Sequence, residues 1–324
     1  MRFSLNGKRR NLPNEATLVL LGPTCSGKSA LALELAGRLG GELISCDSMQ
    51  VYRGLPIGTA QPSMEERARV PHHLVACLRL DEPWNANLFV PEAKRLIAEI
   101  VARGRQPIVV GGTGLYARAL CYDFQLLPSD ATLAAQLREA IATEEGCERL
   151  RAELAAVGPL PDDLSRNPRH LARAVEVFRL TGQPPWCLRG RSEQPLPGFR
   201  QFCLLPEFDA LKERIRRRTA MMVAAGWIEE CREALRNGLA SAPTAWQALG
   251  YRDIALYLEG KGPSSEAELT EQLANRTIQY ARRQLTWFRH QHPGARFLNI
   301  DAYRPGTLGQ LAEEVTESFL SSCR

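Results

Sequence analysis

The octapeptide GPTCSGKS constrains what this chain can fold into more than any other feature. It satisfies the pattern GxxxxGK followed by Ser or Thr, in which successive backbone amides surround a phosphate or diphosphate and the lysine neutralises it. The hydroxyl residue of the pattern can ligate magnesium. The residues concerned are Gly22, Pro23, Thr24, Cys25, Ser26, Gly27, Lys28 and Ser29. We therefore predict a phosphate-binding loop in which Lys28 meets the anion and Ser29 meets magnesium.

The flanking residues place this loop in a parallel α/β sheet. A buried strand is predicted at 17–21, and leucines at four-residue spacing predict a helix at 30–39. Strand, glycine loop and helix in this order open such a sheet. The loop alone does not distinguish ATP, GTP or another diphosphate ester, because all of them present a similar anion.

Two further predicted strands end in polar or glycine residues. The strand at 42–46 leads into Asp47, and the strand at 107–110 leads into GGTGLY, which contains Thr113. Open α/β sheets place their ligands at the carboxyl ends of the strands. Both strand ends are therefore expected beside the phosphate loop, where the glycines permit close approach and Thr113 contributes a hydroxyl.

Several of these polar residues admit more than one interpretation. Asp47 could hold magnesium through water, act as a general base near the diphosphate, or simply cap a helix or turn. Ser48 and Gln50 offer the donor and acceptor pair that can read a purine edge, and both are also common in turns. The histidines of PHHL, His72 and His73, have no second ligand pair nearby, which favours a structural role over a metal site.

Composition and length narrow the class of protein. The 324 residues are enough for about two domains, and 44% hydrophobic with 24% charged residues exclude a disordered or fibrous chain. No apolar stretch approaches the roughly 18 residues of a membrane helix, and the basic first residues lead into the glycine loop instead of a signal-peptide core. The nine cysteines form no CxxC and no Cys/His cluster, so neither zinc nor disulfides are expected. We expect a cytoplasmic protein with no membrane partner.

The distribution of charge indicates a helical insertion. Residues 125–163 are helical and mostly acidic, whereas residues 164–191 are mostly basic. Proline and glycine from Gln183 to Gly198 supply a linker back to the core. The predicted organisation is a core at 1–124 and 197–324, an insertion domain at 125–196, a core strand at 202–205 and helices from Asp209 onward.

Two more basic runs lie in the predicted core. One spans residues 212–218, and the other joins four arginines to nearby aromatic residues within 276–289. Cationic runs interleaved with aromatic residues suit phosphate tracking and base stacking, although a single run is often only a solvated helix face. The net charge of +5 is too mild to decide, but three basic stretches in one chain favour RNA.

Seven motifs in series carry a resemblance to a known family. They are GPTCSGKS, DSMQVYRGLPIGTA, VPHHL, VGGTGLYARAL, RNPRHLARAVEVFRLTG, GYRD and YARRQLTWFR. In this order and spacing they resemble the tRNA dimethylallyltransferases, which act on adenosine 37, from about Thr17 to Arg289. The resemblance implies a P-loop NTPase-like core, a helical insertion that grips the anticodon stem-loop, dimethylallyl diphosphate as donor, and Mg²⁺. Action by a loop-binding clamp suggests a monomer.

The resemblance also implies residue roles. Asp47, Thr113 and Lys28 would be catalytic, with Asp47 accepting the N6 proton of a flipped adenine. Arg214 or Arg218 would join the loop at residues 22–29 in stabilising the diphosphate, and Ser29 would ligate magnesium. The expected tRNA-binding residues are Asp47, Ser48, Met49, Gln50, Thr113, Arg169, His170, Leu171, Ala172, Arg173, Gln247, Gly250, Tyr251, Arg252, Arg282, Arg283, Gln284, Trp287 and Arg289.

Small departures and two rival functions accompany the resemblance. Cys25 stands where alanine is common, and Gln61 stands where lysine is usual, but neither change removes a required group. No carboxy-terminal zinc-finger spacing is present, which fits the bacterial form. A small-molecule kinase would also need the phosphate loop, Asp47 and arginines, yet it would leave the basic insertion and YARRQLTWFR unexplained. A non-catalytic RNA-binding adaptor would need no general base.

Overall fold

Six parallel strands form the central sheet in the part of the chain that the structure describes, in the order β3-β2-β4-β1-β5-β6. This computed structural model describes residues 16–122, 126–162, 164, 167–188, 194–300 and 307–323. The strands are β1 (Thr17–Leu21), β2 (Gly41–Ser45), β3 (His72–His73), β4 (Gln106–Gly111), β5 (Phe199–Pro206) and β6 (Arg296–Ile300). Every residue of β1 is buried, as expected for a central parallel strand with both faces covered.

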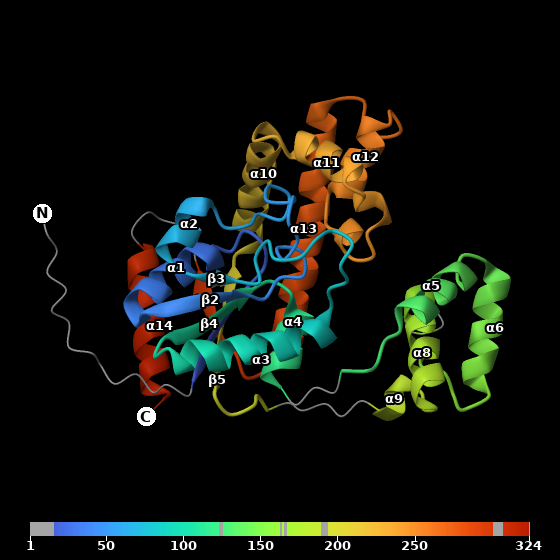
Figure 1. Cartoon of the computed structure of the whole chain (residues 1–324), viewed down its shortest axis with the longest axis horizontal. Coiled ribbons are helices and arrows are strands. Elements are labelled where there is room, and N and C mark those ends of the chain that lie inside the picture. The colour runs from blue at the N-terminus through green and yellow to red at the C-terminus, as the bar shows by residue number, and fades with distance from the viewer. Residues whose placement is uncertain are drawn as a thin grey trace, which may run out of the picture. The chain divides into compact units, whose positions relative to one another are not determined.

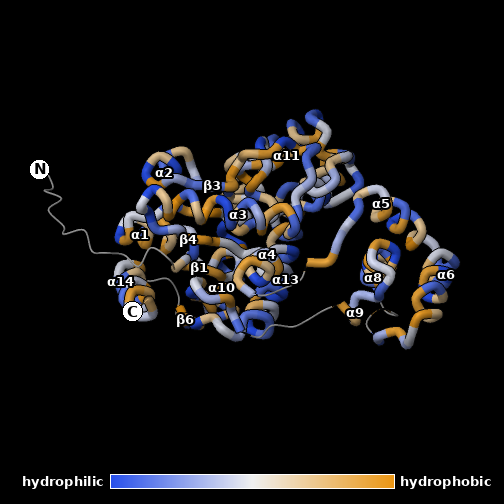
Figure 2. The backbone as a smooth tube through the Cα atoms, turned by 60° about the horizontal axis from the view of Figure 1, so that its bottom comes forward, coloured by the Kyte–Doolittle hydropathy of each residue, from blue (hydrophilic) through white to orange (hydrophobic). Residues whose placement is uncertain are grey.

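Helices cover both faces of this sheet. On one face, Leu31 and Leu35 of α1 (Lys28–Leu39) share a core with Phe319 of α14 (Thr307–Ser321) and with Leu18 and Leu20 of β1. The other face carries α3 (Ala86–Ala102) and α4 (Gly114–Cys121), which lie together in front of the strands in Figure 1. Hydrophobic and hydrophilic residues recur along α3 and α14 in Figure 2, as expected for amphipathic helices with one buried side.

Two long helices stand beside the phosphate loop. Leu211 and Ile215 of α10 (Phe208–Ala224) pack against Ile278, Ala281 and Leu285 of α13 (Glu266–Gln291). This packing presents one side of each helix to the carboxyl ends of the strands. The remaining helices of the core are α2 (Met64–Arg69), α11 (Trp227–Arg236) and α12 (Tyr251–Leu258), with single 3-10 turns at Leu239–Ser241 and Ala245–Gln247.

A second compact unit comprises the described residues from 126 to 188. Its helices are α5 (Ala131–Ala140), α6 (Glu144–Ala155), α8 (Pro168–Thr181) and α9 (Pro185–Leu188). Leu137, Leu150, Leu171 and Val175 form its core. At its centre the buried Glu176 accepts hydrogen bonds from Ser129 and from the amide of Asp130.

The α/β fold with a P-loop core is confirmed, and four predicted strands are present with small shifts at their ends. Three details are corrected. The edge strands β3 and β6 were not predicted, because their pairing is set by neighbours distant in sequence. The predicted linker contains the short helix α9, and Pro195 forms a bridge with Tyr122 of the core, so the insertion ends earlier than residue 196. Four charged residues of the acidic and basic stretches from which the insertion was predicted, at positions 163, 166, 189 and 191, lie outside the described residues.

Among the residues that the structure describes, no helix combines the length and the apolar character needed to cross a bilayer.

Candidate active site

The loop between β1 and α1 has the geometry of an anion cradle. Cys25 and Gly27 adopt left-handed backbone conformations, with φ of 60° and 87°, and such turns direct successive amides to one side of the loop. A Cβ atom at Gly22 would lie 2.8 Å from the Ser26 Oγ, so this position needs glycine. Lys28 opens α1, and its Nζ donates to the Pro23 carbonyl at 3.1 Å. The Lys28 side chain is therefore folded back over the phosphate loop.

The surroundings of Lys28 disfavour its charged form. Burial lowers the pKa of Lys28 as the largest effect, and the nearby Arg218 lowers it further, whereas the carboxylate of Asp47 raises it. An anionic ligand would act in the same direction as Asp47 and stabilise the ammonium form. The surroundings of Lys28 therefore favour the binding of an anion beside it.

Asp47 lies directly after β2 and organises its own turn. Its Oδ1 accepts hydrogen bonds from the amides of Met49 at 2.9 Å and Gln50 at 3.3 Å. The amide of Ser48 donates to Thr113 Oγ1 at 3.1 Å, and the amide of Thr113 donates to the Cys46 carbonyl at 3.2 Å. The loops that follow β2 and β4 therefore hold Asp47 and Thr113 next to each other. A Cβ atom at Gly111 would overlap the Cys46 carbonyl, which explains the glycine there.

Gln50 has a structural role that the sequence left open. Its Oε1 accepts from Ser45, and its Nε2 donates to the carbonyls of Thr59 and Ala60. Gln61 in turn donates to the carbonyls of Gln50 and Tyr52. Because these partners use both ends of the Gln50 amide, the side chain ties the end of β2 to the loop at 55–61 instead of presenting a free edge to a base.

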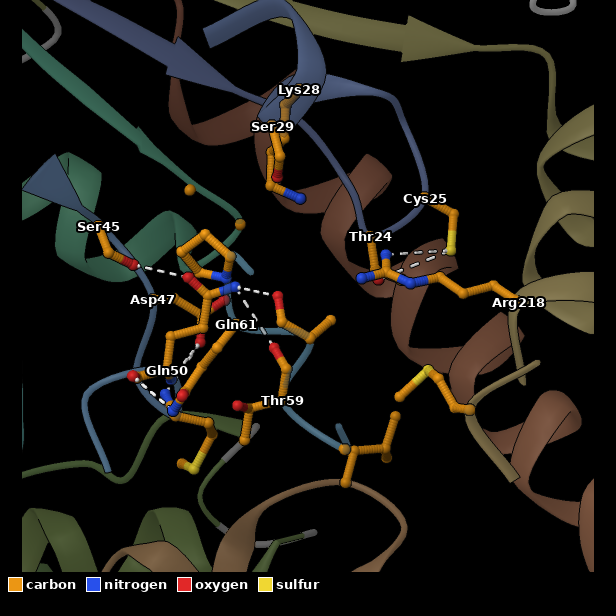
Figure 3. Close-up of a pocket in the computed structure, with 18 of the residues that line it drawn as sticks. Thr24, Cys25, Lys28, Ser29, Ser45, Asp47, Gln50, Thr59, Gln61 and Arg218 are labelled. Atoms are coloured by element: carbon orange, nitrogen blue, oxygen red, sulfur yellow. Dashed lines mark hydrogen bonds between the residues drawn. The ribbon is translucent and has the colours of Figure 1, made fainter. Parts of the chain in front are cut away.

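One cavity of about 810 Å³ joins these parts. Figure 3 shows Lys28 and Ser29 on one side of it, Asp47 and Gln50 on another, and Arg218 of α10 reaching toward Thr24 and Cys25. Arg218 lies close enough for its Nη1 to contact Cys25 Sγ at 3.6 Å. The lining thus combines cationic side chains that can bind a diphosphate with a carboxylate that can accept a proton.

The same cavity has an apolar wall, which sequence reasoning did not identify. Its members come from α10, the start of α11 and two loops: Met221, Met222, Trp227, Ile57 and Leu249. A wall of this kind suits a hydrocarbon chain attached to a diphosphate. The only signal in the sequence was the pair of methionines after the basic run at 212–218.

Hydrogen bonds to the partly buried Glu230 fix this apolar wall. Glu230 accepts hydrogen bonds from the amides of Ile57 at 2.6 Å and Gly58 at 2.9 Å, and from the hydroxyl of Tyr251 at 2.6 Å. A Cβ atom at Gly58 would come within 2.1 Å of the Trp227 indole nitrogen. Burial and Glu230 both raise the pKa of Tyr251, so its phenol stays protonated and donates to the carboxylate.

Comparisons with known proteins agree with this site. The family model described as IPP transferase matches residues 50–291, and the one described as isopentenyl transferase matches residues 15–73. The tRNA dimethylallyltransferase of Geobacillus kaustophilus is 42% identical over 309 residues, which are 94% of this chain and 95% of the relative. That of Deinococcus radiodurans is 40% identical over 280 residues, or 84% and 89% of the two chains. The chain belongs to the tRNA dimethylallyltransferase family.

A solved structure extends the similarity to three dimensions. The full-length tRNA isopentenylpyrophosphate transferase of Bacillus halodurans superposes with a TM-score of 0.68 at 32% identity, covering 95% of this chain and 98% of that one. The P-loop core and the inserted helices are therefore features of the family fold.

Half of the expected family residues of the core line the cavity. They are Thr24, Cys25, Lys28, Ser29, Asp47, Ser48, Met49, Gln50, Arg218, Gln247, Arg283 and Gln284. Arg214 does not line it, and its Nε donates to the Ala210 carbonyl one turn earlier in α10. The position of Arg218 in the cavity lining favours it over Arg214 as the arginine of the diphosphate site, and this role stays a prediction.

The expected RNA-contacting residues differ in exposure. The exposed residues are Arg169, His170, Gln247, Arg252, Arg282, Arg283, Trp287 and Arg289. Leu171, Ala172 and Tyr251 are buried, and Gln284 is 7% exposed, so a role in tRNA binding stays a prediction for these four residues. Arg173 is partly buried and committed to the carbonyls of Leu127 and Pro128 and to Glu176. Gly250 is covered by the Trp227 ring.

The two histidines of PHHL contact protein groups. His73 pairs with Glu42 at 2.7 Å, and His72 Nδ1 lies 2.7 Å from the Val70 carbonyl. Arg103 also binds Glu42, and the hydrogen bonds from Arg103 and His73 lower the pKa of this buried carboxyl against the opposing effect of burial. The structural role predicted for this segment is consistent with these contacts.

Proposed function

We propose that this chain transfers the dimethylallyl group of dimethylallyl diphosphate to N6 of adenosine 37 in the tRNA anticodon loop and releases diphosphate. The observation that carries the proposal is the single cavity in which Lys28, Asp47 and an apolar wall meet. Such a lining suits a ligand with an anionic end and a hydrocarbon end, together with a nucleophile that must lose a proton. The names of the Geobacillus and Deinococcus relatives state the transfer of a dimethylallyl group to tRNA.

The leaving group would lie in the loop at residues 22–29. The C1–O bond of the allylic diphosphate breaks and negative charge grows on the departing oxygen, where Lys28, Arg218 and the loop amides would stabilise it. Since an allylic carbon tolerates positive charge, this neutralisation should contribute more to the rate than the base does. Burial lowers the pKa of Lys28, and an anion bound at this site would stabilise its charged form.

Magnesium fits the same end of the cavity. Ser29 lies in the first turn of α1 and lines the cavity on the Lys28 side. Mg²⁺ is usually held by one or two protein oxygens, substrate phosphates and water, so a single hydroxyl beside the proposed diphosphate site is a suitable protein ligand for it. Ser29 would ligate the ion, which when bound adds positive charge beside the diphosphate.

Asp47 would accept the proton. As the bond from N6 to C1 forms, the nitrogen must lose one hydrogen, and a carboxylate lining the cavity can take it. One of its oxygens remains committed to the amides of Met49 and Gln50, which orients the carboxylate. Thr113 supports the neighbouring backbone by accepting from the Ser48 amide, and its own hydroxyl hydrogen remains for donation toward the reacting groups.

The RNA must present a base that has left its stack. Flipping an adenine costs about a few kcal/mol, which contacts elsewhere on the loop must offset. Arg283 lines the cavity from α13, and Trp287 and Arg289 are exposed further along the same helix. In the helical unit, Arg169 and His170 are exposed at the start of α8. These residues would hold the anticodon stem-loop through phosphate contacts and stacking.

We also propose that the protein acts on the tRNA as a monomer, because a clamp on a single stem-loop needs no second copy. We propose the cytoplasm as the location of the reaction.

A mass measurement tests the proposal. An unmodified anticodon stem-loop with adenosines at 36 and 37 is incubated with the protein, magnesium and dimethylallyl diphosphate, beside a control that receives ATP instead. We expect a gain of one five-carbon unit on adenosine 37. No gain, together with phosphate transfer from ATP to a small molecule, would overturn the proposal in favour of a kinase.

A further inference from the structure

Gln284 of α13 joins the two glycine loops of the active site. Its side chain is 7% exposed. Its Oε1 accepts a hydrogen bond from the Thr24 amide at 2.9 Å, and its Nε2 donates to the Gly112 carbonyl at 2.9 Å. Thr24 lies in the phosphate loop after β1, and Gly112 precedes Thr113 in the loop after β4. One side-chain amide thus connects two loops that come from neighbouring strands.

The two partners require an amide at this position. A backbone N–H can only donate and a backbone C=O can only accept, so the oxygen of Gln284 must face Thr24 and its nitrogen must face Gly112. A methionine of similar length would lose both hydrogen bonds. A carboxylate would keep the first and place an acceptor against the Gly112 carbonyl. A Cβ atom at Gly112 would lie 2.6 Å from Nε2, so the contact also depends on glycine there.

The connection extends from the leaving group to the base. The amide of Thr24 belongs to the loop proposed to hold the diphosphate. On the other side, Gly112 is followed by Thr113, which bonds the Cys46 carbonyl and the Ser48 amide on either side of Asp47. The chain of contacts therefore runs from the diphosphate loop through Gln284 to the loop that carries Asp47.

The transfer reaction depends on the distance between the diphosphate loop and the loop that carries Asp47. Bond formation at C1 requires the nitrogen, the carbon and the departing oxygen to be aligned, and the groups that serve the two ends lie on different strands. An error of about 1 Å in such an alignment can cost about 10²-fold in rate. A fixed link between the two loops removes that freedom before the substrate binds.

The surroundings of Gln284 make the link rigid. Ala281 and Leu285 on the same helix pack against Leu211 and Ile215 of α10. A Cβ atom at Gly114 would come within 2.2 Å of the Trp287 ring, so α13 also lies tight against the start of α4. A side chain on a helix held in this way keeps its position relative to both loops.

We propose that Gln284 is a positioning residue that sets the distance between the diphosphate loop and the Asp47–Thr113 loops, and that its side chain does not contact RNA. The proposal rests on the transferase function proposed above. It replaces the sequence-based expectation that Gln284 belongs to the RNA-contacting set.

Steady-state kinetics of the full chain test this role, with dimethylallyl diphosphate and the unmodified stem-loop as substrates. We expect Gln284→Met to lower kcat by about 10²-fold and to raise KM for dimethylallyl diphosphate. The Kd for the stem-loop, measured by fluorescence anisotropy, should stay unchanged. The matched control is Gln106→Met, since Gln106 is a buried glutamine that bonds the Ala16 and Pro107 carbonyls away from the cavity. Its kinetics should match those of the unsubstituted chain.

A second variant provides a readout that a loss of folding would not reproduce. In Gln284→Glu, a protonated carboxyl group can donate to Gly112 and accept from Thr24 as glutamine does, whereas the carboxylate cannot donate. The kcat of this variant relative to the unsubstituted chain should therefore rise as the pH falls, while the same ratio for Gln284→Met stays flat. Melting temperatures above the assay temperature show that each variant is folded.

The outcomes separate this inference from the proposed function. Weaker stem-loop binding by Gln284→Met, in proportion to its loss of kcat/KM, would mean that Gln284 contacts RNA and would overturn the inference. So would catalysis equal to that of Gln106→Met, or a kcat ratio for Gln284→Glu that does not change with pH. Failure of the unsubstituted chain to transfer any five-carbon unit would instead overturn the proposed function, and the inference with it.

Discussion

The catalytic core and the helical unit use charged side chains in different ways. In the core, Lys28, Asp47 and Arg218 come from three separate segments and line one cavity. In the helical unit, Arg173 is paired with the buried Glu176, and Arg179 forms two hydrogen bonds with Glu153. The cavity of the core thus leaves charge available to a ligand, whereas Arg173 and Arg179 in the helical unit are paired with glutamates of that unit.

This difference shows which positions of charged residues in a sequence indicate a functional role. Lys28 follows a glycine loop and Asp47 follows a strand, so the backbone fixes their direction, whereas Arg218 reaches the cavity from helix α10. The arginines of the helical unit lie on a helix face, where a glutamate one turn away or on the next helix can claim them. A basic run on a helix therefore indicates a ligand only after its possible partners have been excluded.

The largest expected effect is in the phosphate loop. Lys28→Ala should lower kcat by about 10³-fold, because it removes the cation that faces the departing diphosphate. The matched control is Arg38→Ala on the same helix, since Arg38 is paired with Glu34 at its far end. We expect this control to retain full transfer activity. Equal losses in both variants would mean that the charge of the helix, and not the cavity, determines activity.

The next effect concerns the base. Asp47→Asn should lower kcat by about 10²-fold, while its side-chain oxygen still accepts from the Met49 amide and keeps the turn. Stem-loop transfer is measured at saturating RNA, beside Asp209→Asn at the exposed start of α10. Normal turnover of the Asp47 variant would contradict its assignment as the proton acceptor.

The core could be predicted from the sequence because the glycine loops that follow its strands are recognisable as sequence motifs. GPTCSGKS and GGTGLY each follow an apolar strand, and the positions of Asp47 and Thr113 next to these strands follow from the parallel sheet. The edge strand β6 left no such mark, because Arg296–Ile300 is short and its pairing with β5 depends on residues far away in the chain.

Side-chain partners were the part that the sequence could not supply. Gln50, Tyr251 and Gln284 lie in motifs that resemble the family, and the structure shows each of them bonded to backbone groups or to Glu230. Glu230 itself lies outside every motif, in a helix whose other glutamates, Glu229 and Glu233, pair with arginines on the surface. Nothing local distinguishes it from them.

Acid should weaken the core more than the helical unit. Burial lowers the pKa of His292 to about 4, below its unfolded value of 6.5. Between these values the unfolded chain binds more protons than the folded one, so stability falls as the pH drops through this window, by about 2 kcal/mol at pH 5. In the helical unit the histidine is His170, which is exposed. Hydrogen exchange at pH 7 and pH 5, corrected for intrinsic rates, should show loss of protection in the core strands.

His292→Gln should reduce this pH dependence between pH 6.5 and pH 5. An equal loss of protection in β1 and in α8, or none in β1, would contradict the assignment of acid sensitivity to the core.

The smallest expected effects separate the two kinds of arginine within the helical unit. Arg173→Ala leaves Glu176 buried without its cation and should destabilise the unit by about 1–2 kcal/mol, a value reduced from that of a fully buried pair because Arg173 is partly exposed. Arg169→Ala removes an exposed cation and should leave stability unchanged. It should instead weaken stem-loop binding and lower the salt slope of that binding by about one.

Arg283→Ala in the core should resemble Arg169→Ala in its effect on RNA, since its side chain is exposed and lines the cavity. Hydrogen exchange of α8 and the salt dependence of stem-loop Kd are measured for all three variants. If Arg173→Ala weakened RNA binding without loosening α8, Arg173 would bind RNA as Arg169 is proposed to do. The contrast between the two regions would then be one of degree, and the pair of Arg173 with Glu176 would have to open when RNA binds.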